Sequence, residues 1–462
     1  MFTFLITDVF LYMIVISLGC YIYYVRNNYD LSKNWKLVFK KTTGVISIVF
    51  LAFFIFIALI DSIHFKTKMW NEQKSEYVYT DNIESLLDKI LKPIYINYEK
   101  SYSAPFSNHL YSKETILMEN GEEIRIYPLL KYKVNLSHDN EDKIFNIVTI
   151  VLSSLLLVLL SFIFFFIIWY LVIFKEKSNI SLIDSVILLI KNNIPLYFTL
   201  FILFFISTSL YNLSLEYYVL GTDKVGLDVL YKSIKSIRTG MIIGTLTTLV
   251  MLPFAIFLGI LAGYMGGIID DIIQYIYTTL NSIPSVLLIA SAILMLQVYM
   301  SNNPIDFQNI YERADLRLFF LCLILGLTSW TGLCRLLRGE SMKLRSIDYI
   351  KAAEIFGLKK ISIIIRHFVP NIMHIVVITV VLDFSALVLA EAVLSYVNIG
   401  VDPTTYSWGN MINAARLELS REPVVWWSLF ASFIFMFILV LFANLFADNV
   451  RDAFDPKSKG NK

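Results

Sequence analysis

Charge is scarce in this sequence and carries no strong sign. Of the 462 residues only 16% are charged, with 39 Lys and Arg against 37 Asp and Glu. A soluble domain has about a quarter of its residues charged, so the composition is unusual for one. No cluster of basic residues indicates binding to nucleic acid.

Cysteines and catalytic motifs are equally scarce. Cys20, Cys322 and Cys334 lie inside apolar runs without metal-ligand spacing, and three scattered cysteines argue against a disulfide framework. The five histidines show no such spacing either. The sequence has no Gly-x-x-x-x-Gly-Lys-Ser/Thr P-loop, no His-Glu-x-x-His and no Gly-x-Ser-x-Gly. We therefore expect no enzyme activity, metal or cofactor in this chain.

Apolar runs are what the sequence has in abundance. Hydrophobic residues make up 57% of the chain, and they gather in runs of about 20 residues, enough to cross a hydrocarbon core of ~30 Å. Backbone groups in lipid must be bonded internally, so each run is predicted to be helical. We expect an all-α polytopic membrane protein with spans near 4–24, 43–63, 146–174, 194–213, 240–263, 281–300, 318–337, 372–394 and 427–447.

Lysine and arginine in the loops predict the orientation of the chain. They gather in 25–42, in 338–366 and in the C-terminal tail, which nine spans place on one side. We expect that side to be cytoplasmic, with the N-terminus outside and the C-terminus inside. One loop disagrees, because it falls outside and carries four basic residues: Lys224, Lys232, Lys235 and Arg238.

Two polar stretches interrupt the apolar pattern. Residues 64–143 lie on the outer side and contain strand-like pieces at 123–128 and 130–134, separated from earlier helix-like sequence by the turn signal Asn120-Gly121. We predict a small extracytoplasmic α+β insertion there. Residues 301–317 are expected to form a polar outer loop.

Residues 348–371 form a polar, lysine-bearing segment between two apolar runs. Just before and within it, Leu344, Ile347 and Ile350 recur every third residue. This spacing predicts an apolar stripe on a short helix, able to enter a groove on a partner protein. An ordinary cytoplasmic loop with a short interfacial helix is the alternative on this pattern alone.

A spaced set of small and polar residues makes the segment distinctive: Ala352, Ala353, Gly357, His367, Pro370 and Asn371. The set resembles the cytoplasmic "EAA" loop of ABC importer permeases. In that family the loop is a short helix that docks on an ATPase subunit and passes its movement to the pore. Here Lys351 stands where the family usually has Glu, which puts an ion-pair partner in doubt. Gly357 would supply a tight bend or a close backbone contact.

Further blocks in the same order resemble the C-type permease of oligopeptide and dipeptide ABC importers from Tyr217 to the end. They are Leu220-Gly-Thr-Asp-Lys-Val-Gly-Leu-Asp-Val-Leu, Gly259-Ile-Leu-Ala-Gly-Tyr-Met-Gly-Gly, Asn281-Ser-Ile-Pro, Leu327-Thr-Ser-Trp-Thr-Gly, Leu389-Ala-Glu-Ala-Val-Leu-Ser-Tyr, Ser407-Trp-Gly-Asn-Met and Arg451-Asp-Ala-Phe-Asp-Pro. Leu227 stands where that subfamily usually has Arg.

The resemblance implies a six-span type I permease core with added segments. We expect two extra N-terminal spans in 1–63, the insertion in 64–143, a third extra helix and linker in 144–190, and the core in 191–462 with the coupling loop at 340–368. It also implies a bacterial inner-membrane location and four kinds of partner: a second homologous permease, two ATPase subunits that use ATP and Mg²⁺, an extracytoplasmic solute-binding protein, and membrane lipid.

The same resemblance assigns candidate site residues. The coupling set is Ile347, Tyr349, Ile350, Lys351, Ala352, Ala353, Gly357, His367, Pro370 and Asn371. The candidates for contact with the binding protein are Gly221, Thr222, Asp223, Trp408, Gly409 and Asn410. For His367 we expect packing or hydrogen bonding rather than ligation. Trp408 suits either a docking contact or an interfacial position.

Asp383 and Glu391 lie inside the eighth span, eight residues apart and so roughly on one helix face. Ionisable groups at such depth are candidates for a translocation path. For Glu391 we favour the alternative, a hydrogen bond to a neighbouring helix. The expected function is peptide import. The alternatives are import of nickel or of a peptide antibiotic, or a membrane sensor or enzyme using residues 64–143.

Overall fold

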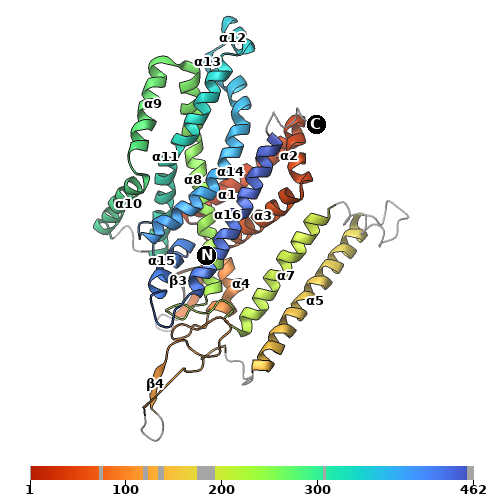
Figure 1. Cartoon of the computed structure of the whole chain (residues 1–462), viewed down its shortest axis with the longest axis vertical. Coiled ribbons are helices and arrows are strands. Elements are labelled where there is room, and N and C mark those ends of the chain that lie inside the picture. The colour runs from red at the N-terminus through yellow and green to blue at the C-terminus, as the bar shows by residue number, and fades with distance from the viewer. Residues whose placement is uncertain are drawn as a thin grey trace.

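The structure is a computed structural model that describes residues 2–71, 76–117, 123–133, 140–173, 193–304 and 309–454. Figure 1 shows a long bundle of helices with strands toward one end. Within these described residues nine helices are long and apolar enough to cross a membrane, in agreement with the expected spans. The fold class is confirmed: the chain is an all-α polytopic membrane protein with small sheets.

The nine long helices are α1 (Ile6–Asn27), α3 (Thr42–Asp61), α5 (Asn140–Ile173), α7 (Ile194–Glu216), α8 (Val229–Met265), α10 (Ser285–Asn302), α11 (Ile310–Arg345), α14 (Val369–Tyr396) and α16 (Trp427–Phe454). The shorter ones are α2 (Tyr29–Lys40), α4 (Leu86–Tyr95), α9 (Gly267–Ser282), α12 (Asp348–Ile355), α13 (Lys360–Ile363), the π-helical turn η1 (Ile364–Phe368) and α15 (Trp408–Glu418). The strands are β1 (Phe2–Thr3), β2 (His64–Asn71), β3 (Glu76–Ser85), β4 (Glu114–Leu117) and β5 (Glu123–Ile126).

Two helices extend well beyond the predicted spans. α8 has 37 residues and α11 has 36. The expectation of a polar loop over 301–317 was wrong, because the Asn309 side chain accepts a hydrogen bond from Tyr311 N at 3.0 Å and starts α11 there. α9 was not anticipated. It turns away from α8 at Gly266 and Gly267, whose φ angles are +66° and +55°.

α8 and α11 form the centre of the bundle. Half of the residues in the apolar window of each are buried, against 11% for α5 and 17% for α7. Their backbones approach closely at Gly259 and Gly263. A Cβ on Gly263 would lie 2.5 Å from Ser341 Cβ and 2.6 Å from Arg338 O. Small residues allow this kind of close helix packing in membranes.

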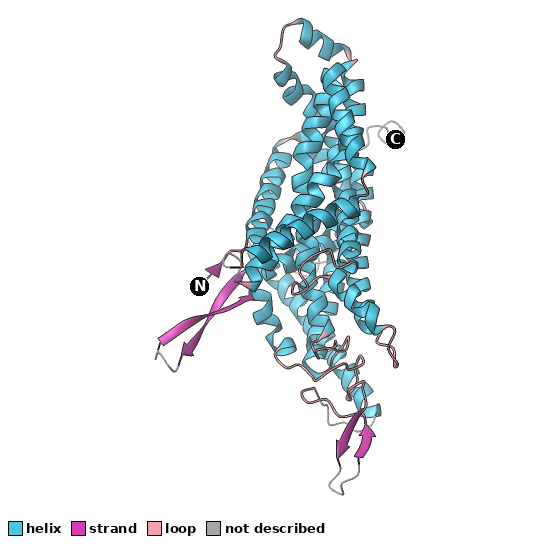
Figure 2. Ribbon diagram, turned by 90° about the vertical axis from the view of Figure 1, so that its left-hand side faces the viewer, coloured by secondary structure: helices cyan, strands magenta, loops and turns pink. Residues whose placement is uncertain are grey.

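The polar insertion contains a three-stranded antiparallel sheet in the order β1-β2-β3 and a separate β4–β5 hairpin (Figure 2). α4 follows β3 and begins with a capping box, in which the side chains of Ser85 and Asp88 each accept from the other's backbone N–H. Burial alone would raise the pKa of Asp88, but the Lys235 ammonium outweighs it and the pKa is lowered.

The predicted strand pieces are borne out only in part. Residues 123–126 form β5 and pair with β4. Residues 130–133 lie in a loop, where Leu130 N donates to Asn108 O and Lys131 N to the Glu99 carboxylate. These loop contacts satisfy the backbone that a strand would otherwise pair. The turn signal Asn120-Gly121 and residue Val134 lie outside the described residues.

α3 packs into the body of the bundle. Phe50 of α3 stacks on Phe442 of α16 with centroids 3.8 Å apart, and Thr43 donates a hydrogen bond to Asn449 at 3.0 Å. At the other end of α3, Asp61 pairs with Lys235 of α8 at 2.6 Å. This helix is therefore tied to two helices of the expected core, although the sequence placed it in the N-terminal extension.

α5 and α7 form a hairpin that stands apart from the main bundle in Figure 1. The two helices hold each other through Asn212, which donates to Ser154 at 2.9 Å, and through aromatic side chains. The chain enters and leaves this hairpin at nearly one place, because Lys133 lies 4.1 Å over the Tyr218 ring and 3.1 Å from Asp228. The proposed domain division is not tested by these contacts and stays a prediction.

The basic residues that conflicted with the predicted orientation are mostly held in ion pairs. Lys235 lies between Asp61 and Asp88, at 2.6 and 2.9 Å. Arg238 lies 2.6 Å from Asp8 of α1 and 3.6 Å from Asp315 of α11. Lys232 pairs with Asp223, whereas Lys224 is exposed. The conflicting loop is thus largely a buried anchor for α1, α3 and α4.

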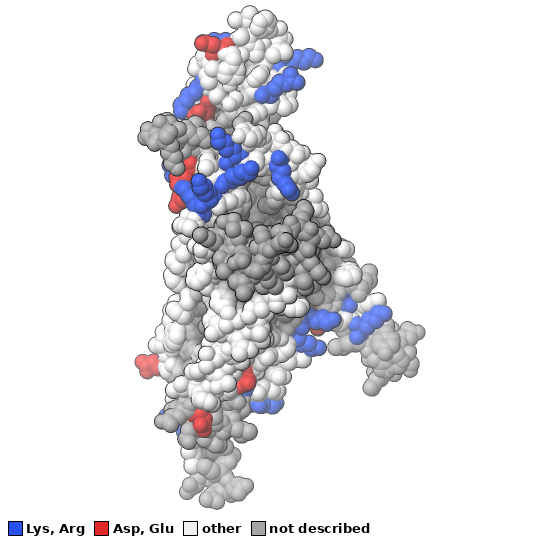
Figure 3. Space-filling model, turned by 90° about the vertical axis from the view of Figure 1, so that its right-hand side faces the viewer, with Lys and Arg blue, Asp and Glu red and all other residues white. Residues whose placement is uncertain are grey.

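The segments expected on one side of the membrane do lie at one end of the molecule. α2, α12 and the end of α16 are together in the upper part of Figure 1, and α4, β3 and β4 are at the opposite end. Figure 3 shows a largely uncharged band between charged side chains toward either end. We call the end with α12 the loop end and the other the outer end. Which of them faces the cytoplasm stays a prediction.

Candidate functional site

The segment predicted to couple forms a helical cap at the loop end. α11 ends at Arg345, α12 covers 348–355, and α13 with η1 leads directly into α14. Pro370 sits in the first turn of α14, where its missing N–H costs no helical hydrogen bond. The cap thus connects two long helices, so a displacement of α12 acts on both of them.

One face of the cap is buried, and this corrects the predicted docking stripe. Leu344 is 8% exposed and Ile350 fully buried, whereas Ile347 is 40% exposed. Ile350 and Ala353 belong to a cluster that also holds Tyr264 of α8 and Phe368 of η1. Periodicity placed the apolar stripe correctly on one face, but that face packs against α8 and η1 instead of facing a partner.

The opposite face of the cap exposes a different apolar group. Ile355 and Phe356 are each 85% exposed, and Leu358, Ile361 and Ile365 are exposed nearby. Gly357 directly follows with φ of +76°, and a Cβ added to it would meet no atom within 4 Å. Of the two roles expected for Gly357, the bend is the one this chain uses. We call Ile355 and Phe356 the apolar tip.

Tyr349, His367 and Asn371 come together at the base of the cap. Asn371 Nδ2 donates to Tyr349 OH at 3.0 Å and to His367 O at 2.6 Å. The rings of Tyr349 and His367 lie 5.8 Å apart. These contacts join α12 to the start of α14, in line with a hydrogen-bonding role for the segment. Lys351 is exposed and lies 4.0 Å from Asp348, one turn earlier.

A contact that the sequence did not suggest braces the cap from α9. Asp270 receives two hydrogen bonds from Arg338 of α11, at 2.5 and 2.7 Å. These bonds lower the pKa of Asp270 despite some burial. Asp270 stands four residues after the glycine-rich block, and its spacing carried no signal. Only the fold brings it beside Arg338.

The two ionisable residues of α14 have different surroundings. Glu391 is 3% exposed, accepts from Ser395 at 2.6 Å, and would lie 2.9 Å from a Cβ on Gly409 of α15. The favoured alternative, in which Glu391 packs toward a neighbouring helix, fits this placement. Asp383 is half-buried and has no hydrogen bond or ion pair within the described part of the chain.

The first half of the predicted binding-protein contact is buried at the outer end. Gly221 has φ of +69° and lies against Ser103 O and the Trp427 ring. Thr222 donates to Ser101 O at 2.9 Å and accepts from Ser103 N at 2.6 Å. Asp223 accepts from the backbone N–H groups of residues 225 and 227. The segment therefore fixes the insertion to the core.

The second half of that prediction is corrected in the same way. Trp408 is 2% exposed, and its indole N–H donates to Ser233 O at 3.1 Å. It is thus neither a docking aromatic nor an interfacial tryptophan. Gly409 lies against Glu391, and Asn410 donates to Asp402 O and Thr405 O, both at 2.9 Å. These residues stabilise the outer end, so a binding protein would have to contact other side chains.

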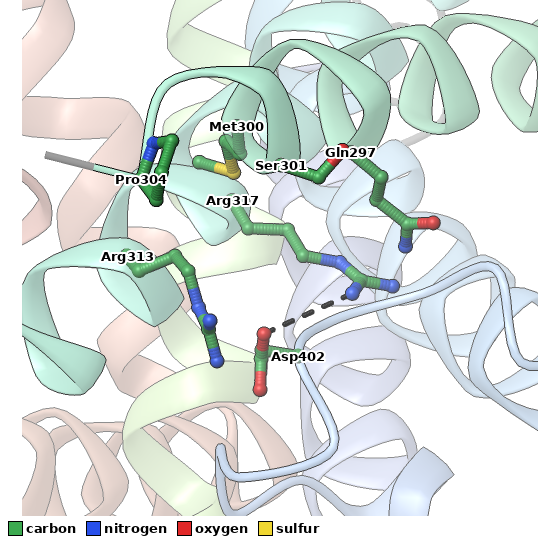
Figure 4. Close-up of a pocket in the computed structure, with 7 residues that line it drawn as sticks. All are labelled: Gln297, Met300, Ser301, Pro304, Arg313, Arg317 and Asp402. Carbon is green, nitrogen blue, oxygen red and sulfur yellow. Dashed lines mark ion pairs between the residues drawn. The ribbon is translucent and has the colours of Figure 1, made fainter. Parts of the chain in front are cut away.

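The outer end also contains a cavity that the sequence did not reveal. Figure 4 shows its seven lining residues, contributed by α10, the first turns of α11 and the loop that follows α14. Its volume is about 440 Å³. Among the described residues no group of three or more His, Cys, Asp or Glu side chains is arranged to hold a metal ion.

Comparisons with known proteins identify the family. The model of the binding-protein-dependent transport system inner membrane component matches residues 255–460. The oligopeptide transport system permease protein of Mycobacterium bovis is 32% identical over 240 residues, which are 52% of this chain and 76% of that protein.

Two other relatives match over a similar length. The dipeptide transport system permease protein of Lactococcus lactis is 29% identical over 241 residues, which are 52% of this chain and 64% of that protein. The glutathione transport system permease protein of Pectobacterium atrosepticum is 29% identical over 240 residues, 52% of this chain and 73% of that protein. With nine apolar helices of its own, the chain belongs to the family of binding-protein-dependent transport system inner membrane components.

Proposed function

We propose that this chain is a pore-forming permease subunit of an ATP-driven, binding-protein-dependent importer for peptides. Its family membership supports the permease role, and the named relatives carry dipeptides, oligopeptides or glutathione. The observation that carries the coupling role is the apolar tip. Ile355 and Phe356 are 85% exposed on a cap held by two long helices, and exposed apolar groups of this kind mark contact sites.

The proposed mechanism gives each part a task. Partner ATPase subunits hydrolyse ATP with Mg²⁺ and close, and their movement displaces α12. The buried face of the cap, built around Ile350 and Phe368, passes that displacement to α11 and α14. The sequence holds one such loop, so a complete importer would combine this chain with a second permease, two ATPases and an extracytoplasmic binding protein.

Within this mechanism Asp383 is the stronger candidate for the translocation path. A carboxylate at membrane depth with no partner in the described residues faces a polar cavity or another subunit in most membrane proteins. Glu391 is enclosed by Ser395 and α15, so we assign it to packing. The loop end is proposed to lie in the cytoplasm of a bacterial cell and the N-terminus outside the inner membrane.

Other cargoes are separated from peptides by direct assay. Nickel and a peptide antibiotic remain the alternative cargoes, and competition for uptake among tetra-alanine, Ni²⁺ and a peptide antibiotic decides between them. A sensor or enzyme built on residues 64–143 is the alternative of a different class. That alternative requires activity without any ATPase partner.

The apolar tip gives the first test. Replacing Ile355 and Phe356 with Ser should abolish co-purification of the ATPase subunits with the tagged full-length chain, because the variant removes the contact surface and leaves the buried face intact. The matched control is Leu417→Ser, an apolar residue 68% exposed on α15 at the outer end. Equal recovery of ATPase with all three proteins would show that the tip is not the docking surface.

A further inference from the structure

The cavity at the outer end is lined by two arginines and only one carboxylate. Arg313 and Arg317 lie on the first two turns of α11, and Asp402 comes from the loop after α14 (Figure 4). Met300 and Pro304 form an apolar wall on the side of α10. The cavity therefore combines net positive charge with an apolar surface, and its volume of about 440 Å³ lies in the range of small-molecule sites.

Arg317 is fully engaged in holding this cavity in shape. It is 8% exposed, and its Nε and Nη2 donate to Gly400 O at 3.2 and 3.1 Å. Turned so that its oxygen faces the guanidinium, the Gln297 side chain accepts from Nη2 and Nη1 at 2.8 and 2.9 Å. Nη1 also lies 3.8 Å from Asp402. No N–H of Arg317 is left over for a ligand.

Asp402 is similarly occupied. Its Oδ1 accepts from the backbone N–H of Thr404 at 3.0 Å and from the hydroxyl of Thr404 at 2.7 Å, and its Oδ2 faces Arg317. The single carboxylate of the cavity thus balances the charge of Arg317 and leaves Arg313 uncompensated.

Arg313 is the group that remains available. It is half-buried and lines the cavity, and it has no hydrogen bond or ion pair within the part of the chain that the structure describes. A guanidinium presents paired N–H donors that match a carboxylate in bidentate geometry. The carboxylate would sit on Arg313, and the adjoining apolar side chain would lie against Met300 and Pro304.

We infer that this cavity binds the C-terminal carboxylate of a peptide, with Arg313 as its partner and Arg317 as a positioning residue. This assignment rests on the proposed function for the class of ligand. It adds a specific subsite at the end of the molecule opposite the coupling cap. A peptide with a free C-terminus should therefore bind more tightly than the same peptide as its amide.

The test uses the full-length chain in nanodiscs of phosphatidylcholine, with tetra-alanine and tetra-alanine amide as probes in calorimetry. The free acid should bind about 10- to 100-fold more tightly than the amide, as expected for a hydrogen-bonded charge pair. Arg313→Gln should remove this preference, and Arg313→Lys should retain part of it. The control Arg416→Gln, an outer-end arginine that stacks on Tyr396, should leave it unchanged.

Three outcomes would overturn the inference. They are equal affinity for acid and amide, including no binding of either, a preference that survives in Arg313→Gln, and loss of peptide binding whenever phosphatidylglycerol is added, which would identify the site as one for lipid phosphate. The proposed function fails by a separate result, absence of ATPase from the purified complex. An unchanged thermal unfolding profile for Arg313→Gln excludes misfolding as the cause.

Discussion

Two glycines with the same backbone conformation have opposite surroundings. Gly221 and Gly357 have φ of +69° and +76°, a region that costs an L-residue ~1–2 kcal/mol. A Cβ on Gly221 would also lie 2.5 Å from Ser103 O and 2.9 Å from the Trp427 ring, whereas one on Gly357 would meet nothing. The first glycine therefore serves both conformation and packing, and the second serves conformation alone.

This difference predicts the ranking of two matched substitutions. Gly221→Ala should lower the temperature of thermal unfolding in detergent markedly, because the strain adds to a clash in the buried outer end. Gly357→Ala should lower it only slightly, since its cost is the strain of ~1–2 kcal/mol in an exposed turn. Equal shifts for the two variants would contradict the packing described around Gly221.

Among the elements, the α5–α7 hairpin and the α1–α3 segment each contribute two membrane helices, yet they are attached differently. The hairpin begins and ends close to Lys133 and Tyr218. By contrast, α1 and α3 supply Asp8 and Asp61, the carboxylates that pair with Arg238 and Lys235 in the core. Removal of one partner from a buried pair typically costs about 3–5 kcal/mol.

Two deletions of equal topological effect test this contrast. Excision of 140–216, with a short Gly-Ser link between residues 139 and 217, should leave a chain that inserts and still recovers ATPase subunits. Deletion of 1–63 should give a chain that is degraded or fails to assemble, because two cations stay buried without partners. The account of the bundle would be contradicted if only the second deletion variant reached the membrane.

The sequence anticipated the elements better than their packing. Runs of apolar residues located the spans, and the small residues around Gly357 located the cap, because both signals are local. Which face of α12 is buried depends on Tyr264 and Phe368, which lie far from Ile350 along the chain. The burial of Trp408 depends likewise on Gly240 and Ser233 of α8. Patterns within one helix cannot contain such information.

At the scale of the whole molecule, α11 links the two candidate sites. Arg313 lies in its first turn at the outer cavity and Arg345 ends it beside the cap. At 1.5 Å per residue its 36 residues span about 54 Å. Close packing on α8 at Gly259 and Gly263 keeps the two helices in contact. A displacement of the cap therefore has a continuous, rigid route to the outer end.

ATP-dependent uptake tests this account most directly. The purified complex that contains the full-length chain, its ATPases, the second permease and the binding protein would be placed in proteoliposomes, and accumulation of labelled tetra-alanine would be measured. Accumulation should require ATP, should be lost when Ile355 and Phe356 are both replaced with Ser, and should persist in Leu417→Ser. Uptake that is independent of ATP, or that is unchanged when the apolar tip is replaced, would contradict the central claim.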